Sequence, residues 1–124
     1  MAFPMRDGSG EIVGIRLRNE QGKKWAITGS KTGIFLPYIE AKKRAYIVEG
    51  PTDTAAALTI GLYAIGRPSC SGGVFDLKET VRRLGIKEMV VVSDNDKPGL
   101  DGADSLARII PIPTCIMTLP CKDM

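Results

Sequence analysis

Residues 45–53 read Ala-Tyr-Ile-Val-Glu-Gly-Pro-Thr-Asp, and residues 89–96 read Met-Val-Val-Val-Ser-Asp-Asn-Asp. Each segment opens with a short apolar run rich in β-branched residues, which predicts a buried strand. Each strand is followed directly by acidic residues. Because open α/β sheets place their sites at the carboxyl ends of their strands, these two segments predict both a fold class and the position of a site.

The residues around these two strands predict the rest of an α/β sheet. Pro51 opens an alanine-rich helix that we expect to run to Ala64. Further along the chain we expect a second strand at 67–71, helices at 76–84 and 102–110, and a last strand at 112–119 that Pro113 interrupts. The order β-α-β-α-β-α-β predicts a mostly parallel, Rossmann-like sheet of about four strands with helices on both faces.

The first part of the chain has a different pattern. Residues 13–18 alternate between apolar and other residues, so we expect Val13, Ile15 and Leu17 to face inward and Arg16 and Arg18 to face outward. A turn at 19–22 leads to a return strand at 23–28, and residues 3–5 form a short earlier strand. The chain is therefore predicted to divide into a small, basic, antiparallel β subdomain at 1–43 and an α/β domain at 44–124.

Composition excludes several classes of protein. The chain has 124 residues, 44% of them apolar, and a net charge of +3, which excludes a mainly disordered chain. The sequence contains no long apolar stretch and no apolar leader, so we expect no membrane association. It contains three cysteines without a CxxC motif and no histidine, which excludes histidine-activated nucleophiles and Cys₂His₂ zinc sites. We expect reduced thiols and a cytoplasmic location.

Charge is distributed unevenly along the chain. Residues 1–44 contain nine Lys or Arg and four Asp or Glu, whereas residues 45–124 contain eight and ten. A basic first part is typical of a surface that binds a polyanion, and it is equally typical of a hairpin kept soluble by lysines. Composition does not choose between these two interpretations.

The acidic residues suggest a metal. If the two strands are neighbours, Glu49, Asp94 and Asp96 converge at one edge of the sheet, where their mutual repulsion favours a bound cation. Oxygen ligands suit Mg²⁺ or Mn²⁺, and Gly50 lets a substrate phosphate approach the backbone. The chemistry indicated is phosphoryl or nucleotidyl transfer, or phosphodiester cleavage. Asp53 is interpreted either as part of this site or as a cap of its helix.

At these residues the chain resembles the Toprim domain, which primases, topoisomerases and some nucleases share. The E-G-x-x-D string of that family is matched from Glu49 to Asp53, and its D-x-D string is matched from Asp94 to Asp96. The resemblance implies that Glu49 is a general acid or base, or a metal ligand. It also implies that Asp94 and Asp96 hold Mg²⁺.

Two further features resemble primases in particular. Residues 7–18 match a D-x-x-G-x-x-x-G-x-R-x-R pattern that ends the basic subdomain in front of a primase Toprim domain. Residues 119–123, which include Lys122 and Asp123, resemble the L-P-x-K-D string of phage and plasmid primase-helicases. The chain departs from the pattern at Lys97-Pro98-Gly99, where primases usually have x-A-G. It also contains no zinc module, no helical first part of the primase core and no helicase motor. We therefore expect a fragment of a larger polypeptide that is inactive by itself.

The resemblance implies a Mg²⁺-dependent nucleotidyltransferase that joins nucleotides on a single-stranded DNA template, with Mn²⁺ as an alternative cofactor. The implied partners are single-stranded DNA, nucleoside triphosphates and a replicative helicase. The candidate nucleotide- or DNA-binding residues are Arg16, Arg18, Lys24, Lys31, Gly50, Asp53 and Lys97. Lys97 is interpreted either as a phosphate ligand or as a counter-charge for the neighbouring acids. Trp25 is interpreted as a packed strand residue or as a platform for a base.

Two other functions remain open at this point. One is a Toprim nuclease, and the other is a non-catalytic module that binds nucleic acid. A response-regulator receiver is excluded because its acid pair follows the first strand, whereas here the acid pair follows the third.

Overall fold

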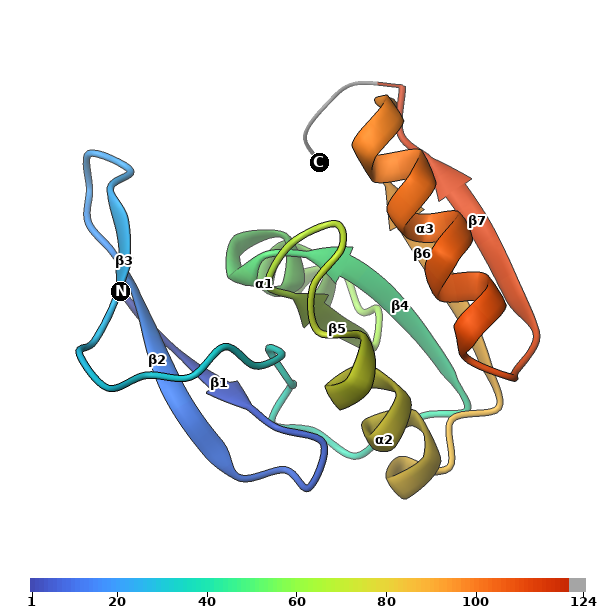
Figure 1. Cartoon of the computed structure of the whole chain (residues 1–124), viewed down its shortest axis with the longest axis horizontal. Coiled ribbons are helices and arrows are strands. Elements are labelled where there is room, and N and C mark those ends of the chain that lie inside the picture. Colours follow the sequence, from blue (N-terminus) through green and yellow to red (C-terminus); the bar gives the residue numbers. More distant parts are fainter. Residues whose placement is uncertain (121–124) are drawn as a thin grey trace.

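The computed structural model describes residues 1–120, so the candidate residues Lys122 and Asp123 lie outside the described residues. Two sheets are present (Figure 1). Antiparallel strands β1 (Ala2–Arg6), β2 (Ile12–Arg18) and β3 (Lys24–Ala26) form the first sheet. No helix within residues 1–120 is long and apolar enough to span a membrane.

The second sheet begins with β4 (Arg44–Glu49) and contains four parallel strands in the order β5-β4-β6-β7. The elements that follow β4 are α1 (Pro51–Thr59), β5 (Ala64–Arg67), α2 (Val74–Leu84), β6 (Glu88–Ser93), α3 (Lys97–Ile109) and β7 (Thr114–Thr118). The predicted order of elements, the parallel sheet and the Rossmann-like α/β class are therefore confirmed. The two strands that carry the acidic strings are neighbours in the middle of the sheet.

Helices cover both faces of the parallel sheet, because both faces of these strands are apolar. Helices α2 and α3 bury Leu77, Val81 and Leu106 against Ile47, Met89 and other residues of the larger core cluster. Helix α1 covers the opposite face, where Ala57 packs with Val48 and Ala64. The strands β4 and β5 are therefore largely buried between helices, whereas the edge strand β7 is mostly exposed.

Several predicted boundaries were wrong. Helix α1 ends at Thr59 because Gly61 turns the chain at a φ of 92°, and Ala64 already belongs to β5. The strand predicted at 67–71 therefore lies at 64–67. Helix α3 begins at Lys97 rather than at 102, because Asp96 caps it and a proline occupies its first turn. Strand β7 begins after Pro113, which has no N–H to donate but whose carbonyl accepts a hydrogen bond of 3.0 Å from Met89 N of β6.

The inward and outward faces of β2 were also assigned wrongly. Val13, Ile15 and Leu17 are only half-buried, whereas Gly14 is fully buried. Arg16 is half-buried as well, and its guanidinium carbon lies 5.9 Å from the centre of the Phe35 ring. The alternation along β2 is real, but the loop that follows β3 covers the face that was expected to be exposed to solvent.

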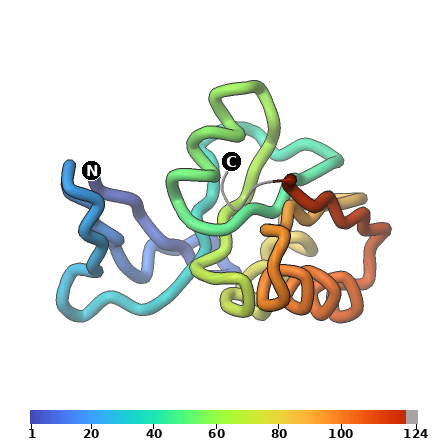
Figure 2. Tube along the Cα trace, turned by 90° about the horizontal axis from the view of Figure 1, so that it is seen from above, coloured from blue at the N-terminus to red at the C-terminus, as the bar shows by residue number. Residues whose placement is uncertain are grey.

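Two sets of hydrogen bonds attach the segments around the first sheet to the α/β part of the chain. Phe35 pairs with Gly66 of β5 through two backbone hydrogen bonds of 2.9 and 2.8 Å. In the turn after β1, the Gly8 N–H donates to Asp76 Oδ1 at 3.1 Å, and Arg83 Nε donates to Gly8 O at 3.0 Å. Figure 2 shows the first sheet beside the α/β layers, with residues 30–43 running between them. The division of the chain at residue 43 stays a prediction.

Candidate active site at the carboxyl edge of the parallel sheet

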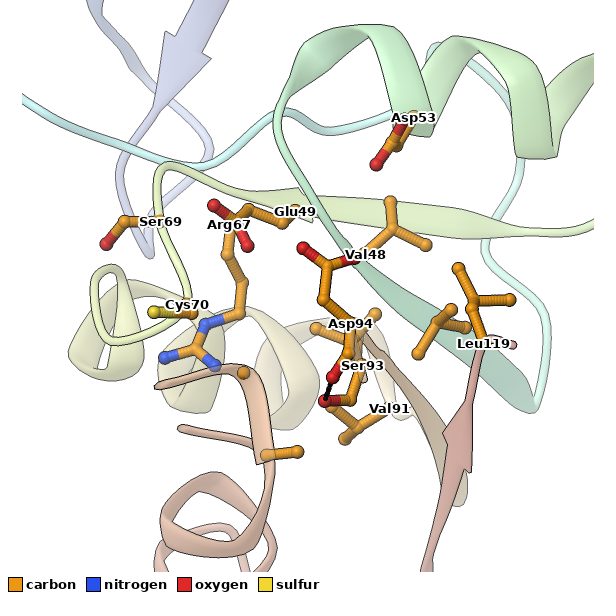
Figure 3. A pocket seen from close by; sticks show the side chains of 14 residues that line it. Val48, Glu49, Asp53, Arg67, Ser69, Cys70, Val91, Ser93, Asp94 and Leu119 are labelled. Carbon is orange, nitrogen blue, oxygen red and sulfur yellow. Dashed lines mark hydrogen bonds between the residues drawn. The ribbon is translucent and has the colours of Figure 1, made fainter. Parts of the chain in front are cut away.

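Three carboxylates line one pocket at the carboxyl edge of the parallel sheet. Glu49 ends β4, Asp94 follows β6, and Asp53 lies in the first turn of α1. In Figure 3 the side chains of Glu49 and Asp94 lie between those of Asp53 and Arg67. The structure thus brings together residues that are about 45 positions apart in the sequence, as neighbouring parallel strands require.

A tight connection between β4 and α1 sets the position of Asp53. Gly50 has a φ of 80°, which glycine adopts without strain, and it is the N-cap residue of α1. Its N–H donates to Arg67 O at 2.7 Å, and its carbonyl accepts from Thr54 Oγ1 at 2.7 Å. The N-cap position itself belongs to Gly50, and Asp53 lies in the first turn of α1. Asp53 also lines the pocket, so the structure places it at the site that the sequence predicted.

The environment of Glu49 is electrostatically unfavourable for its charged form. Partial burial raises the pKa of the Glu49 carboxyl above its ordinary value, and the negative charges of Asp94, Asp53 and Asp96 raise this pKa further. The positive charge of Arg67 opposes the shift. A raised pKa means that protons compete with any cation for this carboxylate at a higher pH than they would at an ordinary glutamate.

We predict that replacing Asp94 by Asn lowers the pKa of Glu49, because one of the negative charges that raises it is removed. The pKa stays above the ordinary value, since burial is the largest cause of the shift. The measurement is a pH titration of the Glu49 side-chain carboxyl carbon by ¹³C NMR. Asp104→Asn on the exposed face of α3 is the control. Equal titration midpoints in the wild type and in Asp94→Asn would show that the two carboxylates do not interact.

Asp96 and Lys97 do not line the pocket that Glu49, Asp53 and Asp94 share. Asp96 Oδ1 accepts a hydrogen bond of 2.8 Å from Gly99 N and so caps α3. It still affects the charge of Glu49 but does not line the pocket. The Lys97 ammonium group lies 2.8 Å from Asp101 Oδ2 at the surface. Lys97 therefore neutralises a surface acid, and not the pair Asp94 and Asp96.

A second, more open groove joins the acidic edge to the first sheet. Arg16 of β2 and Lys24 of β3 line this groove together with Glu49, Gly50 and Asp94. Arg18 and Lys31 are not among its lining residues within 1–120. Trp25 is 42% exposed with the Lys23 ammonium 5.6 Å from its ring centre, so it is not a core residue. Two cationic side chains, Arg16 and Lys24, and three carboxylates, including that of Asp53, therefore line the same groove.

The segment Arg67, Ser69 and Cys70, which lines the pocket, was not among the residues that the sequence indicated. Arg67 is the last residue of β5 and follows three buried residues. An arginine at the carboxyl end of a strand that neighbours β4 is a usable signal. It was missed because the strand was predicted to begin at Arg67 rather than to end there.

The oxygen atoms of the pocket could supply some, but not all, of the ligands of a magnesium ion. No group of three or more His, Cys, Asp or Glu side chains within residues 1–120 is arranged so that it could by itself hold a metal ion. The pocket does offer oxygen ligands from Glu49 and Asp94, and burial, followed by the negative charges of neighbouring acids, raises the pKa of Glu49. Mg²⁺ is commonly held by one or two carboxylates with water and substrate oxygens. The residues present fit that incomplete kind of site.

No family model and no curated protein sequence matches the chain. Solved structures do match it. The primase fragment of the bacteriophage T7 primase-helicase protein has a TM-score of 0.73 and 20% identity, covering 98% of this chain and 54% of that one. The DnaG primase catalytic domain bound to single-stranded DNA has a TM-score of 0.71 and 20% identity, covering 98% and 45%. The Aquifex aeolicus primase, with zinc-binding and RNA polymerase domains, has a TM-score of 0.69 and 17% identity, covering 97% and 34%.

These similarities establish the fold, which is that of the Toprim-containing part of primase catalytic cores. Coverage of nearly the whole chain means that the first sheet and the parallel sheet are matched together. The chain spans about half the length of the first structures that it matches. At this level of identity the activity does not follow from the fold alone.

Proposed function

We propose that this chain is part of a DNA primase and contributes the nucleotidyl-transfer site used in primer synthesis on single-stranded DNA. The observation that carries the proposal is the position of Glu49 and Asp94 at the carboxyl edge of a primase-type fold, facing Arg16 and Lys24 across one groove. A groove with carboxylates on one wall and cations on the other can hold a metal ion and the phosphates of a nucleotide at the same time.

We assign Asp94 as the main metal-binding residue, with Asp96 adding negative charge while it caps α3. When bound there, Mg²⁺ or Mn²⁺ would neutralise the phosphates of an incoming nucleotide and so favour attack at phosphorus. Glu49 either shares the metal or accepts the proton of the attacking hydroxyl group. Its raised pKa supports the second role, because a general base is most effective when its pKa lies near the working pH.

The basic residues of the first sheet are assigned to phosphates. Arg16 and Lys24 lie in the groove and would contact the triphosphate or the template backbone. Gly50, at the N-terminus of α1, leaves room for a phosphate to approach the backbone. We assign Arg18 and Lys31, which lie outside the groove, to the DNA backbone next to it.

The partners proposed are single-stranded DNA, nucleoside triphosphates and a replicative helicase. Two of the similar structures support the nucleic-acid partners. One is a DnaG catalytic domain bound to single-stranded DNA, and the other contains primase domains bound to an RNA/DNA hybrid and dTTP. The helicase is proposed because one similar structure comes from a primase-helicase. We also propose that the β subdomain at 1–43 and the α/β domain at 44–124 act together, since the groove needs both.

One experiment tests this proposal by measuring the binding of a ribonucleotide, the synthesis of a primer and any cleavage of the DNA. The chain is incubated with single-stranded DNA, labelled ATP and Mn²⁺ or Mg²⁺, with Glu49→Gln as the variant of the site and Asp104→Asn as the matched control. We expect metal-dependent binding of ATP that Glu49→Gln weakens and Asp104→Asn leaves unchanged. We expect the DNA to stay intact and primer synthesis by residues 1–124 alone to be weak or absent.

Two outcomes would overturn the proposal in favour of the other functions. Shortening of the DNA that needs the metal but no nucleotide would indicate a nuclease on the same scaffold. DNA binding that ignores both the metal and Glu49→Gln, with no binding of ATP, would indicate a non-catalytic module. Robust primer synthesis by residues 1–124 would contradict the expectation that this chain is inactive by itself.

A further inference from the structure

The parallel sheet has one covered edge and one open edge. At the β5 edge, Phe35 pairs with Gly66 through two backbone hydrogen bonds, so another segment of the chain already occupies hydrogen-bonding groups there. At the other edge, β7 pairs only with β6 among residues 1–120. Figure 1 shows β7 as the outermost strand on that side of the molecule. An open strand edge presents N–H and C=O groups that can pair with a strand of another chain.

The open edge lacks the features that usually prevent strands from pairing with other chains. No residue in the segment 109–120 is charged. Four of the five residues of β7 are exposed, and the strand itself contains neither a proline nor a bulge. The outer strand of the first sheet differs in this respect, because β3 carries the exposed Lys24. The edge of β7 is therefore an uncharged, regular strand that is accessible from outside.

The hydrogen bonds between β6 and β7 show which backbone groups point outward. The Met89 N–H donates to Pro113 O at 3.0 Å. The Leu119 N–H donates to Ser93 O at 3.0 Å. Along a strand the backbone groups alternate in direction, so the odd-numbered residues from 113 to 119 face β6. The residues that direct their N–H and C=O groups to the open edge are therefore Thr114, Ile116 and Thr118.

The sequence of β7 is complementary to itself. Residues 114–118 read Thr-Cys-Ile-Met-Thr. When this strand pairs antiparallel with a second copy about a two-fold axis at Ile116, the two Ile116 residues lie opposite each other and each Thr114 lies opposite a Thr118. These residues direct their backbone groups outward, so each opposed pair can exchange N–H···O hydrogen bonds in both directions. Opposed β-branched side chains stabilise neighbouring strands, and no like charges meet in this register.

We propose that the outer edge of β7 is a dimerisation surface, at which two copies of this chain pair antiparallel through Thr114, Ile116 and Thr118. The product is one sheet that continues through both copies and closes with two-fold symmetry. Because the paired strands run in opposite directions, the carboxyl edges of the two sheets face away from each other. The contact is confined to one short strand, so the dimer is weak and reversible. This inference goes beyond the proposed function, because none of the residues 114–118 lines the acidic pocket or the groove.

The first test is sedimentation equilibrium at protein concentrations up to about 1 mM, the range in which weak contacts dissociate. A reducing agent prevents the exposed Cys115 from linking two copies covalently. We expect the wild type to dimerise reversibly. Ile116→Lys places two like charges opposite each other at the two-fold axis, so the dissociation constant should rise at least about tenfold, and Ile116→Glu should do the same. Ile12→Lys, at an exposed isoleucine of β2, is the control and should dimerise like the wild type.

Two further measurements locate the contact. An equimolar mixture of Ile116→Lys and Ile116→Glu should dimerise again, because each lysine then lies opposite a glutamate. Amide hydrogen exchange of the wild type should slow at Thr114, Ile116 and Thr118 as the protein concentration rises. The amides of Cys115 and Met117 face β6 and should exchange at the same rate at every concentration.

A wild type that stays monomeric up to about 1 mM would overturn the proposal. A dimer that Ile116→Lys leaves as tight as the wild type would show that the contact lies elsewhere. A mixture of the two charged variants that dimerises no better than either variant alone would contradict a two-fold axis at Ile116. If neither variant folds, the mass and the amide exchange of the wild type still decide the question. Since none of these measurements involves a metal ion or a nucleotide, their failure leaves the proposed function standing.

Discussion

Replacing Asp94 by Asn is expected to weaken Mn²⁺ binding by at least about tenfold, since loss of residues that merely support metal ligands already costs that much in other sites. The substitution keeps the shape of the side chain and removes its charge. The backbone should be unaffected, because the Asp94 carbonyl accepts its hydrogen bond from Ser93 Oγ at 2.9 Å whatever the side chain is. Metal-dependent binding of ATP should fall with the metal affinity. The measurements are Mn²⁺ calorimetry and fluorescence titration with a labelled ATP.

The control for this prediction is Asp104→Asn. It removes the same charge from the same half of the molecule, but from an acid that pairs with Arg108 on the exposed face of α3. Loss of metal binding in both variants would mean that overall charge, and not the pocket, attracts the ion. Unchanged binding in Asp94→Asn would move the metal away from the carboxyl end of β6 and would undermine the assignment of the active site.

The position of Glu49 and Asp94 was predictable because it depends on a local sequence pattern and on a general property of parallel sheets. An apolar β-prone run identifies a buried strand, and in a parallel α/β sheet every such strand ends at the same edge. Glu49 and Asp94 follow such runs directly, so their convergence needed no knowledge of packing. The direction of the Asp96 side chain was not predictable in this way. Asp96 is both a candidate ligand and a favourable N-cap residue, and the structure uses it as a cap.

Arg16 and Arg67 show what the sequence could not provide. The alternation along β2 indicates which residues share a face, but it does not indicate which face another segment covers. The loop containing Phe35 covers the face of Arg16, and this contact lies about 20 residues away in the sequence. Arg67 was missed because the start of its strand was predicted three residues too late. The prediction therefore placed Arg67 at the beginning of the strand, whereas the structure places it at the end. The first error concerns long-range packing, on which a local pattern carries no information, and the second concerns a local boundary that the turn at Gly61 determines.

The largest loss of stability is expected from Gly102→Ala, at a position where α3 crosses the loop after β5. A β-carbon built on Gly102 would lie 1.9 Å from the backbone oxygen of Cys70. Alanine favours an exposed helix interior by about 1 kcal/mol relative to glycine. Overpacking of a filled interior costs about 1–3 kcal/mol and occasionally more. Here the clash should win, because its partner is a backbone carbonyl that cannot rotate away. We expect a net destabilisation of about 1–2 kcal/mol, measured by urea unfolding.

The control is Ser105→Ala, at an exposed position on the same helix, which should leave the free energy of unfolding within about 0.5 kcal/mol of the wild type. The comparison also tests the site, because Cys70 and Ala103, on either side of this crossing, both line the acidic pocket. If α3 moves away to accommodate the new methyl group, Mn²⁺ affinity should fall together with stability. A variant as stable as the wild type would show that α3 does not approach the loop after β5 so closely. The wall of the acidic pocket that Cys70 and Ala103 form would then be more loosely packed than the structure indicates.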